Sequence, residues 1–361
     1  MKAVILVGGQ ATRLRPLTTH IPKAMVPVLN TPFLEHVLRH LQRHRVTDIV
    51  LAQHHLAAPI EYHLGDGSRF GVKLSYIVED SPRGTAGAVK NVEGHLDEPF
   101  LVLNGDIFAD LDITAMVDLH RQRGAVATIA LTPVEDPTAY GLIETDVRGK
   151  VTRFLEKPDW SEVTTNMINA GVYVLDPCIL EWIPEGTQVS IERETFPRLV
   201  ESGEPVYTFS SRGYWMDMGT PEKYLLLHRD LFAGRSTWYS PATPDEVRVG
   251  AQCDMDPGAA ITGPALIGDG CVIGKGVRLI GPVVLGNGCR VGAGSVVDDS
   301  ILWWEVSLAE NVTLRESAVA NGCRLESGCR VEGTVLGDNV TVLPGVRLAP
   351  ETRVDPGTRV A

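Results

Sequence analysis

The sequence predicts an α/β domain with a mixed sheet, followed by a parallel β-helix. Up to about residue 234, strand-like and helix-like segments alternate, as they do in parallel and mixed α/β sheets. From Val249 to Val297, an aliphatic residue recurs at every sixth position, which is the period of hexapeptide β-helices. We therefore divide the 361 residues into a first domain (1–234), a linker (235–248) and a β-helix (249–361).

The first domain contains short apolar runs with the length and composition of buried strands, and one amphipathic helix at 32–41. The other side of that helix carries His36, His40 and His44. Because Arg39 and Arg43 stand among them and would repel a cation, we interpret this side as a solvated face. The predicted strands are 3–7, 48–52, 73–78, 100–103, 126–131, 171–175 and 205–209.

The β-helix follows a stretch rich in Gly, Ser, Thr and Pro, which is typical of a linker. The leading aliphatic position of the hexads recurs every six residues from Val249 to Val297. Later the step shortens to five at three places that are seventeen residues apart, and we interpret these as coils that each lack one residue at the same corner. The short steps are 297–302, 314–319 and 331–336. In proteins with this repeat the coil is left-handed, whereas most connections between parallel strands are right-handed.

The bulk composition excludes several classes of protein. A net charge of −12 argues against nucleic acid and against an anionic membrane as partners. Cys253, Cys271 and Cys289 are spaced eighteen apart at the small inward hexad position, which Cys323 and Cys329 also occupy, so we predict buried thiols rather than metal ligands or disulfides. With no readable signal peptide and no membrane-length apolar segment, we expect a cytoplasmic location.

The stretch 6–25, LVGGQATRLRPLTTHIPKAM, combines glycines with two cations. Leu6, Gly8 and Gly9 end an apolar strand, and glycine lets backbone N–H groups approach phosphate oxygens closely. Arg13 adds a planar fork of donors and Lys23 a compact charge, so that the two could share a polyphosphate. A strand followed by two glycines indicates only a tight turn by itself, but the added cations favour an anion site.

Two aspartates follow apolar segments elsewhere in the chain. Asp106 ends the run FLVLNGD, at the carboxyl end of a strand, where open α/β sheets bind ligands. Asp217 lies in the apolar turn WMDMG, where a buried carboxylate needs a cation or a donor. Magnesium is usually held by one or two carboxylates plus substrate phosphates. Taken alone, each aspartate is equally consistent with a turn or capping role.

Together these motifs resemble the signature of the sugar-1-phosphate nucleotidyltransferases, also called NDP-sugar pyrophosphorylases, which reads GGxGTRLxPLT…PKxxxPV. The match covers essentially the whole first domain, and several branches of the family also carry a hexad domain. One position departs: Ala11 replaces the third glycine, and its methyl group restricts φ and crowds the phosphate approach. The resemblance implies a Rossmann-like mixed sheet with Asp106 and Asp217 as ligands of Mg²⁺.

Three further segments extend the resemblance: GTAG (84–87), FLEKP (154–158) and NAG (169–171). By that resemblance the nucleotide would be contacted by Leu6, Gly8, Gly9, Glu79, Gly84, Thr85 and Asp106. Lys157 would bind the phosphate of the sugar. The sugar hydroxyls would be bound by Glu156, Asn169 and the backbone of Gly141.

The implied reaction is Mg²⁺-dependent attack of a sugar 1-phosphate on the α-phosphorus of a nucleoside triphosphate. Because the attacking oxygen is already anionic, catalysis needs positioning and charge neutralisation rather than a strong base. The resemblance gives catalytic roles to three residues: Asp106 through the metal, Arg13 on the departing pyrophosphate, and Lys23 on the phosphates.

Glu79 bears on the choice of base, because the thymidylyl branch of the family commonly carries Gln there. Guanine presents N1–H and N2–H₂ donors, which suit an acceptor-only carboxylate. Glu79 therefore favours GTP, and the whole chain most resembles mannose-1-phosphate guanylyltransferases, which form GDP-mannose. The alternative activities are those of a glucose-1-phosphate thymidylyl-, uridylyl- or adenylyltransferase. The alternative interpretation of Glu79 is that it merely faces solvent at a strand end.

Other classes of protein remain to be weighed. Hexad β-helices often belong to acyltransferases that use a histidine base, but the last histidine, His228, precedes the β-helix. A catalytically silent NDP-sugar sensor stays open because of Ala11, although the retained Arg13, Lys23, Asp106 and Asp217 argue against it. By resemblance we also expect a homodimer or a higher homo-oligomer.

Overall fold

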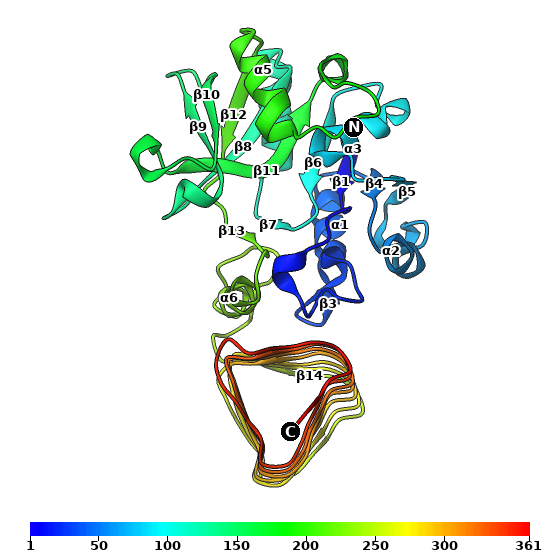
Figure 1. Cartoon of the computed structure of the whole chain (residues 1–361), viewed down its shortest axis with the longest axis vertical. Coiled ribbons are helices and arrows are strands. Elements are labelled where there is room, and N and C mark those ends of the chain that lie inside the picture. The colour runs from blue at the N-terminus through cyan, green and yellow to red at the C-terminus, as the bar shows by residue number, and fades with distance from the viewer. The chain divides into compact units, whose positions relative to one another are not determined.

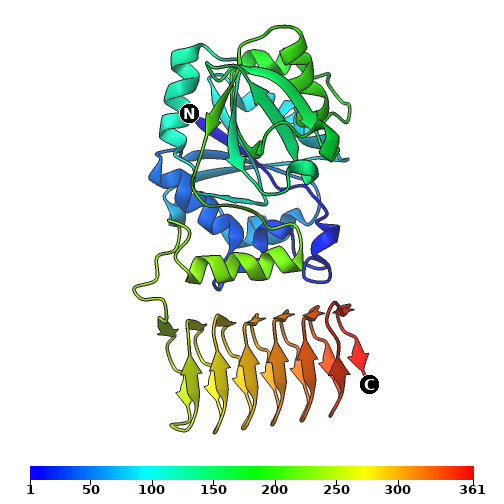
Figure 2. The same ribbon diagram turned by 90° about the vertical axis from the view of Figure 1, so that its left-hand side faces the viewer.

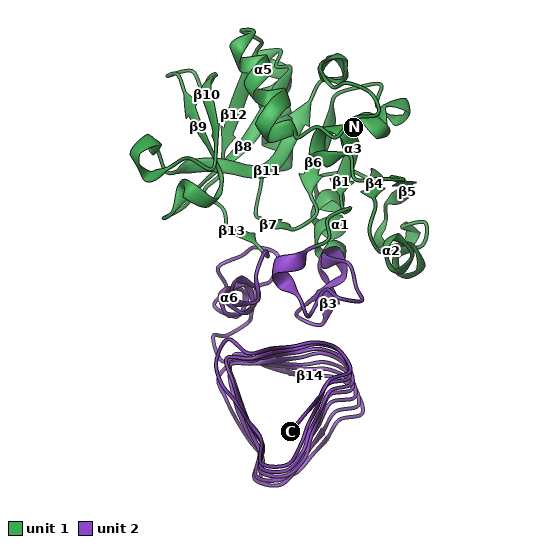
Figure 3. Cartoon of the chain, viewed as in Figure 1, with its two compact units in different colours: residues 1–10, 34–217 green, residues 11–33, 218–361 purple.

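The computed structural model describes residues 1–361, and it divides into two compact units (Figure 3). Neither unit is a continuous stretch of chain. Unit 1 contains residues 1–10 and 34–217, and unit 2 contains residues 11–33 and 218–361. The segment that carries Arg13 and Lys23 thus groups with the C-terminal part of the chain. The domain boundaries at 234 and 249 stay predictions.

Unit 1 is built on a nine-stranded mixed sheet, as predicted (Figure 1). The order is β10-β9-β11-β6-β1-β4-β5, and β8 pairs with both β11 and β12. β1 is parallel to β4 and β6, whereas β11 is antiparallel to β6, β8 and β9. The strands are β1 (Lys2–Leu6), β4 (Asp48–Gln53), β5 (Lys73–Val78), β6 (Phe100–Asn104), β8 (Ala127–Pro133), β9 (Gly141–Thr145), β10 (Val151–Glu156), β11 (Met167–Leu175) and β12 (Val206–Ser210).

Each predicted strand is present within a few residues, and the antiparallel strands β9 and β10 were not predicted. A small two-stranded sheet pairs β7 (Ile107–Ala109) with β13 (Trp215–Asp217). The helices of the first part of the chain are α1 (Phe33–Arg43), α2 (Ala57–Leu64), α3 (Gly84–Asn91), α4 (Ile113–Arg123) and α5 (Phe196–Glu201). None of the helices in the chain has both the length and the apolar character needed to cross a bilayer.

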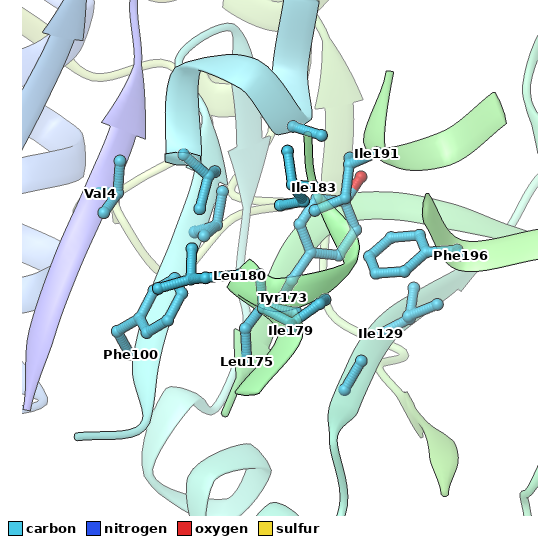
Figure 4. Close-up of a cluster of buried hydrophobic side chains, with 14 of the residues drawn as sticks. Val4, Phe100, Ile129, Tyr173, Leu175, Ile179, Leu180, Ile183, Ile191 and Phe196 are labelled. Carbon is cyan, nitrogen blue, oxygen red and sulfur yellow. The ribbon is translucent and has the colours of Figure 1, made fainter. Parts of the chain in front are cut away.

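The core cluster in Figure 4 packs α3 and α5 against the sheet around two aromatic rings. Tyr173 and Phe196 are fully buried, and their ring centroids are 5.0 Å apart in an edge-to-face arrangement. Edge-to-face pairs place the positive ring edge against the negative ring face, so the contact adds to simple burial. The cluster fixes β11 and the chain around residue 191, and both contribute residues to the candidate site.

The interpretation of the histidine side of α1 as solvated is wrong for His40. His40 is only 8% exposed, and its Nε2 lies 3.0 Å from the Leu111 carbonyl oxygen. Burial, reinforced by the neighbouring His44, lowers the pKa of His40 to about 4. The apolar periodicity identified one packed face of the helix but could not show that the chain before α4 covers part of the other face.

The β-helix of unit 2 is left-handed, and its coils form three parallel sheets (Figures 1 and 2). The first sheet contains β14 (Val247–Val249), β17 (Ala265–Ile267), β20 (Val283–Leu285), β23 (Ile301–Leu302), β26 (Ala318–Val319), β29 (Val335–Leu336) and β32 (Arg353–Val354). The second contains β15 (Asp254–Met255), β18 (Val272–Ile273), β21 (Arg290–Val291), β24 (Ser307–Leu308), β27 (Arg324–Leu325), β30 (Thr341–Val342) and β33 (Arg359–Val360). The third contains β16 (Ala260–Thr262), β19 (Arg278–Ile280), β22 (Val296–Asp298), β25 (Thr313–Arg315), β28 (Arg330–Glu332) and β31 (Arg347–Leu348).

The strand register confirms the predicted hexads and the shortened coils. Val297 pairs with Leu314, which pairs with Val331, and each partner lies seventeen residues further along the chain. The earlier pairs, such as Leu279 with Val297, are eighteen residues apart. Because inward aliphatic side chains stack directly on one another, the change of spacing in the sequence reports the change of coil length.

Hydroxyl groups fill the short corner of the shortened coils. Ser300 donates to the Asp298 carbonyl and accepts from the Ser317 amide. Ser317 in turn donates to the Arg315 carbonyl and accepts from the amide of Thr334. All three hydroxyl-bearing residues are fully buried, and this ladder supplies acceptors to the amides of Ser317 and Thr334.

The prediction of buried, unbridged thiols is confirmed for four cysteines of the β-helix. All six cysteines of the chain are free, and Cys271, Cys289, Cys323 and Cys329 are buried, whereas Cys253 in the first coil is half-buried. The Cys289 thiol donates to the Trp303 carbonyl at 3.0 Å. The thiols act as small interior groups that also bond the backbone of the next coil.

Candidate functional site

The candidate site of unit 1 lies where parallel strands end. β1 stands between β4 and β6, so the chain leaves β1 towards one side of the sheet and later returns on the other. Open α/β sheets bind ligands at such switch points, beyond the carboxyl ends of the strands. Gly8 follows β1, and Gly105 and Asp106 follow β6. The Gly105 amide donates to the Leu6 carbonyl at 2.9 Å, and a Cβ at position 105 would lie 2.5 Å from that oxygen, so the close approach requires glycine.

The two predicted metal-binding aspartates lie close together. β7 begins directly after Asp106, and it pairs antiparallel with β13, whose last residue is Asp217. In this register Asp217 is opposite Ile107, the next residue after Asp106. Asp217 is only 7% exposed, whereas Asp106 is half-buried. No group of three or more His, Cys, Asp or Glu side chains in the chain could hold a metal. Two carboxylates completed by phosphate oxygens are nevertheless the usual protein contribution to a Mg²⁺ site, so the residues fit this ion.

Three polar side chains near these strand ends have buried atoms without a hydrogen-bond partner in the chain. They are the amide group of Gln53, Oε1 of Glu79 and Oδ1 of Asn104, at the ends of β4, β5 and β6. Gln53 is fully buried, and leaving such groups unpaired costs about 1–3 kcal/mol each. Sequence reasoning missed Gln53, although a polar residue closing an apolar strand is a usable signal.

Glu79 is buried and does not face solvent, which removes the alternative interpretation of this residue. Its Oε2 accepts a long hydrogen bond of 3.4 Å from the Arg83 amide. Burial raises the pKa of Glu79, and the Arg83 amide and the charge of His54 only partly oppose the shift. A buried carboxylate with an unpartnered oxygen is suited to accept hydrogen bonds from a ligand.

α3 begins at Gly84, and part of its amino terminus is already occupied. The amides of Ala86 and Gly87 both donate to the Val189 carbonyl, at 3.0 and 3.3 Å. The hydroxyl of Thr85 donates to Glu192 at 2.7 Å and accepts from the Ile191 amide at 2.9 Å. Nucleotide contact by Gly84 and Thr85 stays a prediction, and for Thr85 the backbone rather than the hydroxyl is the available group.

The four predicted sugar-phosphate residues come together on three neighbouring strands. Gly141 in β9 is the register partner of Glu156 in β10, and Lys157 follows Glu156 directly. A Cβ at Gly141 would lie 2.9 Å from the Glu156 carboxylate, so the glycine keeps this space open. Asn169 in β11, which pairs with β9, donates to the Tyr173 hydroxyl at 2.8 Å and accepts from the Gly171 amide.

Glu192 is a central residue that sequence reasoning missed. Its carboxylate accepts from Tyr173 at 3.1 Å, as well as from Thr85 and Ser190. Burial raises the pKa of Glu156, and the charge of Glu192 raises it further. No motif surrounds Glu192 in the sequence, because its role comes from the short turn that brings residue 191 against α3.

In unit 2, the predicted cations lie on two short helical turns. Arg13 is exposed on the turn Thr12–Leu14, and Lys23 is half-buried on the turn Lys23–Met25. Ala11 adopts the left-handed conformation with φ 47°, which costs a non-glycine residue about 1–2 kcal/mol. The Thr18 hydroxyl donates to the Ala11 carbonyl at 2.9 Å and helps to hold this conformation. The loop thus keeps the backbone geometry that a glycine would adopt freely.

Comparisons with known proteins agree with this arrangement. Residues 2–233 match the family model described as nucleotidyl transferase, and residues 245–348 match the model described as EIF2B subunit epsilon LbH domain. A mannose-1-phosphate guanylyltransferase of Mycobacterium tuberculosis (strain ATCC 25618 / H37Rv) is 38% identical over 271 residues, which cover 74% of each chain. A UTP–glucose-1-phosphate uridylyltransferase of Synechocystis sp. (strain ATCC 27184 / PCC 6803 / Kazusa) is 36% identical over 304 residues, or 74% of this chain and 78% of the relative.

A solved structure is also similar. The crystal structure of HddC from Yersinia pseudotuberculosis complexed with GMP-PN aligns with a TM-score of 0.55 at 29% identity, covering 63% of this chain and 98% of that one. The match to the family model spans well over half of the residues and includes both aspartates and the glycine turn. This chain therefore belongs to the nucleotidyl transferase family.

Proposed function

We propose that the chain transfers a nucleotidyl group from a nucleoside triphosphate to a sugar 1-phosphate and releases pyrophosphate. The favoured substrates are GTP and mannose 1-phosphate, and the product is then GDP-mannose. The observation that carries the proposal is the β7–β13 pairing, which puts Asp217 opposite the residue that follows Asp106. Two segments far apart in the chain thus supply two oxygen ligands at the end of β6.

In the reaction, an anionic oxygen of the sugar 1-phosphate forms a bond to the α-phosphorus, and the bond to the β-phosphate bridging oxygen breaks. No proton has to be removed from the nucleophile, so positioning and charge neutralisation suffice. Asp106 and Asp217 would hold Mg²⁺, which when bound neutralises charge on the phosphate oxygens. Arg13 stabilises the departing pyrophosphate, and Lys23 binds the phosphates of the triphosphate.

The sugar phosphate is the ligand of the β9–β10–β11 group. Lys157 anchors the phosphate, while Glu156, Asn169 and the Gly141 backbone bind hydroxyls. In support, these residues are gathered on neighbouring strands and Gly141 leaves room beside the Glu156 carboxylate. Nothing in this group distinguishes mannose from glucose, so the sugar preference rests on the relative from M. tuberculosis.

The preference for guanine rests on Glu79. Its buried carboxylate has an oxygen without a protein partner, and guanine offers two adjacent donor groups to such an acceptor. The complex of HddC with GMP-PN shows that a guanine nucleotide analogue binds to a similar protein. The second candidate is uridylyl transfer to glucose 1-phosphate, which the relative from Synechocystis favours. We further propose a cytoplasmic location and a homodimer or higher homo-oligomer.

Pyrophosphate release by the full chain tests the proposal. GTP, dTTP, UTP and ATP are each supplied with mannose 1-phosphate or glucose 1-phosphate, with Mg²⁺ or with excess chelator. We expect release only with Mg²⁺, and fastest with GTP and mannose 1-phosphate. A clear preference for another triphosphate would reject the guanine assignment, and no release with any pair would favour an NDP-sugar sensor.

A further inference from the structure

The segment 11–33 is held by contacts with the rest of unit 2 at both of its ends. It carries Arg13 and Lys23, and unit 2 otherwise consists of α6 (Pro221–Phe232) and the chain that leads into and forms the β-helix. These contacts join residues that are far apart in sequence, so they depend on the folded β-helix. They raise the question of what the β-helix contributes to the loop of Arg13.

One end of the segment is a tight hairpin formed by β2 (Pro27–Val28) and β3 (Thr31–Pro32). The Tyr224 hydroxyl of α6 donates to the Pro27 carbonyl at 2.6 Å and accepts from Nε1 of Trp303, a β-helix residue, at 3.0 Å. The side chain of Asn30 donates to the Leu285 carbonyl of β20 at 2.7 Å. The hairpin is therefore bonded directly to α6 and to one coil, and through Tyr224 to a second coil.

The other end is the loop of Arg13 (residues 11–19), whose backbone carbonyls bind Arg353 of β32. Directly after the loop, the His20 imidazole lies 3.3 Å from the carboxylate of Asp338, also in the β-helix. Nη1 of Arg353 donates to the Arg13 carbonyl at 2.9 Å and to the Arg15 carbonyl at 3.4 Å. Nη2 of Arg353 lies 3.4 Å from the carboxylate of Glu222 on the first turn of α6. The guanidinium thus links the backbone of the loop, α6 and the β-helix.

The two carbonyls that Arg353 binds accept no hydrogen bond from an amide within the loop. The carbonyls of residues 11, 12, 14 and 16 accept from amides within the loop. The carbonyl of Arg13 has no such partner, because residue 16, which would close the corresponding turn, is a proline and has no N–H. Arg353 therefore supplies a donor that the sequence of the loop cannot provide.

We propose that Arg353 is a positioning residue for nucleotidyl transfer: from the β-helix it fixes the backbone that presents Arg13 to the departing pyrophosphate. The inference rests on the proposed function, because it needs Arg13 to act in the reaction. It gives the β-helix a direct part in catalysis through a side chain 340 residues away from Arg13 in the sequence. Arg353 itself does not touch substrate.

The same β-helix offers a matched control. Arg347 in β31 occupies the equivalent position, directly before an inward aliphatic residue, and is likewise exposed. Its backbone pairs with β28, but its side chain has no hydrogen-bond or ion-pair partner in the chain. Arg347→Ala therefore removes the same charge and the same side chain from the same kind of strand without touching the loop.

The experiment measures kcat and KM for pyrophosphate release in Arg353→Ala, Arg353→Lys, Arg347→Ala, Arg13→Ala and the double variant Arg13→Ala/Arg353→Ala. Misplacement of a reacting group by about 1 Å costs up to about 10²-fold, so we expect kcat of Arg353→Ala to fall by about 10- to 10²-fold with little change in KM for the sugar 1-phosphate. Arg353→Lys should recover part of the loss, and Arg347→Ala should match the wild type. In the Arg13→Ala background, Arg353→Ala should have almost no further effect.

Three outcomes would overturn the inference while leaving the proposed function intact. The first is an Arg353→Ala variant as active as Arg347→Ala, alongside an Arg13→Ala variant that is strongly impaired. The second is a full, independent loss from Arg353→Ala when Arg13 is already removed. The third is a lowered melting temperature of Arg353→Ala that accounts for the whole loss, so that the folded fraction of the variant has normal kcat. Near-normal activity of Arg13→Ala would instead reject the role of Arg13 and, with it, the role of Arg353.

Discussion

The sheet of unit 1 and the β-helix of unit 2 both bury polar side chains, but they treat them differently. In the β-helix, the buried hydroxyls of Ser300 and Ser317 are donors and acceptors to the backbone of their own and the next coil, and no buried side-chain nitrogen or oxygen between residues 249 and 361 lacks a partner. At the strand ends of the sheet, atoms of Gln53, Glu79 and Asn104 have none. A satisfied buried group holds the fold together, whereas an unsatisfied one beside a ligand-binding edge is a candidate for binding.

The largest effect should come from the aspartate pair of unit 1. Replacing Asp106 with Asn removes a charged oxygen ligand while keeping the shape, and the loss of one charge-stabilising group costs ~10²–10³-fold in turnover. We expect this loss in Mg²⁺-dependent pyrophosphate release, with an unchanged melting temperature. Asp254→Asn, at an exposed position of the β-helix, is the control and should be fully active. Near-normal release by Asp106→Asn would show that the carboxylates of the sheet edge are not catalytic.

The next prediction concerns His40, a buried polar residue of unit 1 that contributes to stability and has no role in the reaction. The pKa of His40 is about 4 in the folded chain, against 6.5 for an exposed histidine. Between these pH values the imidazole therefore binds a proton in the unfolded chain but stays neutral in the folded chain. Stability should therefore fall as the pH drops from 6.5 to 4, by at most about 3 kcal/mol. The charged or titratable groups beside it are His44, Arg43 and Asp112.

Urea unfolding at pH 7.5 and pH 4.5 measures this effect. The acid-induced loss should be smaller in His40→Gln than in the wild type. His95→Gln, which changes an exposed histidine, should keep the full loss. Equal pH dependence in His40→Gln and the wild type would show that His40 does not account for the acid sensitivity.

The serine ladder tests the satisfied groups of the β-helix. Ser317→Ala leaves the buried Thr334 amide without its acceptor, at a cost of about 1–3 kcal/mol, whereas the Arg315 carbonyl keeps the Gly333 amide as a donor. The melting temperature should fall, while kcat of the folded protein stays the same. The control is Ser327→Ala, an exposed serine of the same domain. An unchanged melting temperature for Ser317→Ala would mean that the short corner does not need its hydroxyl.

Glu79 should give the smallest effect, a change in selectivity. An amide at this position presents a donor as well as an acceptor, so Glu79→Gln should lower the ratio of kcat/KM for GTP to that for dTTP by about 10-fold. Because burial raises the pKa of Glu79, the preference of the wild type for GTP should also weaken as the pH falls. Asp80→Asn, at the exposed neighbouring position, should change neither property. If Glu79→Gln left this ratio unchanged, the Glu79 carboxylate would not determine which base the enzyme prefers.

The sequence by itself determined the β-helix almost completely, including which coils are shortened. Each inward residue there stacks on a partner seventeen or eighteen positions away, so the three-dimensional repeat is written as a repeat in the sequence. It also determined most strands of the sheet, whose apolar runs report burial on both faces. The family signature named Asp106 and Asp217 without showing that they meet.

Only the tertiary structure decided what packs against what. The pairing of Asp217 with Ile107, the burial of His40 and the hydrogen bonds of Glu192 all join segments with no regular spacing between them. The same is true of Arg353 and the loop of Arg13. Periodicity reports which side of an element is apolar, but the identity of the partner on that side is set by long-range packing, which leaves no local signal in the chain.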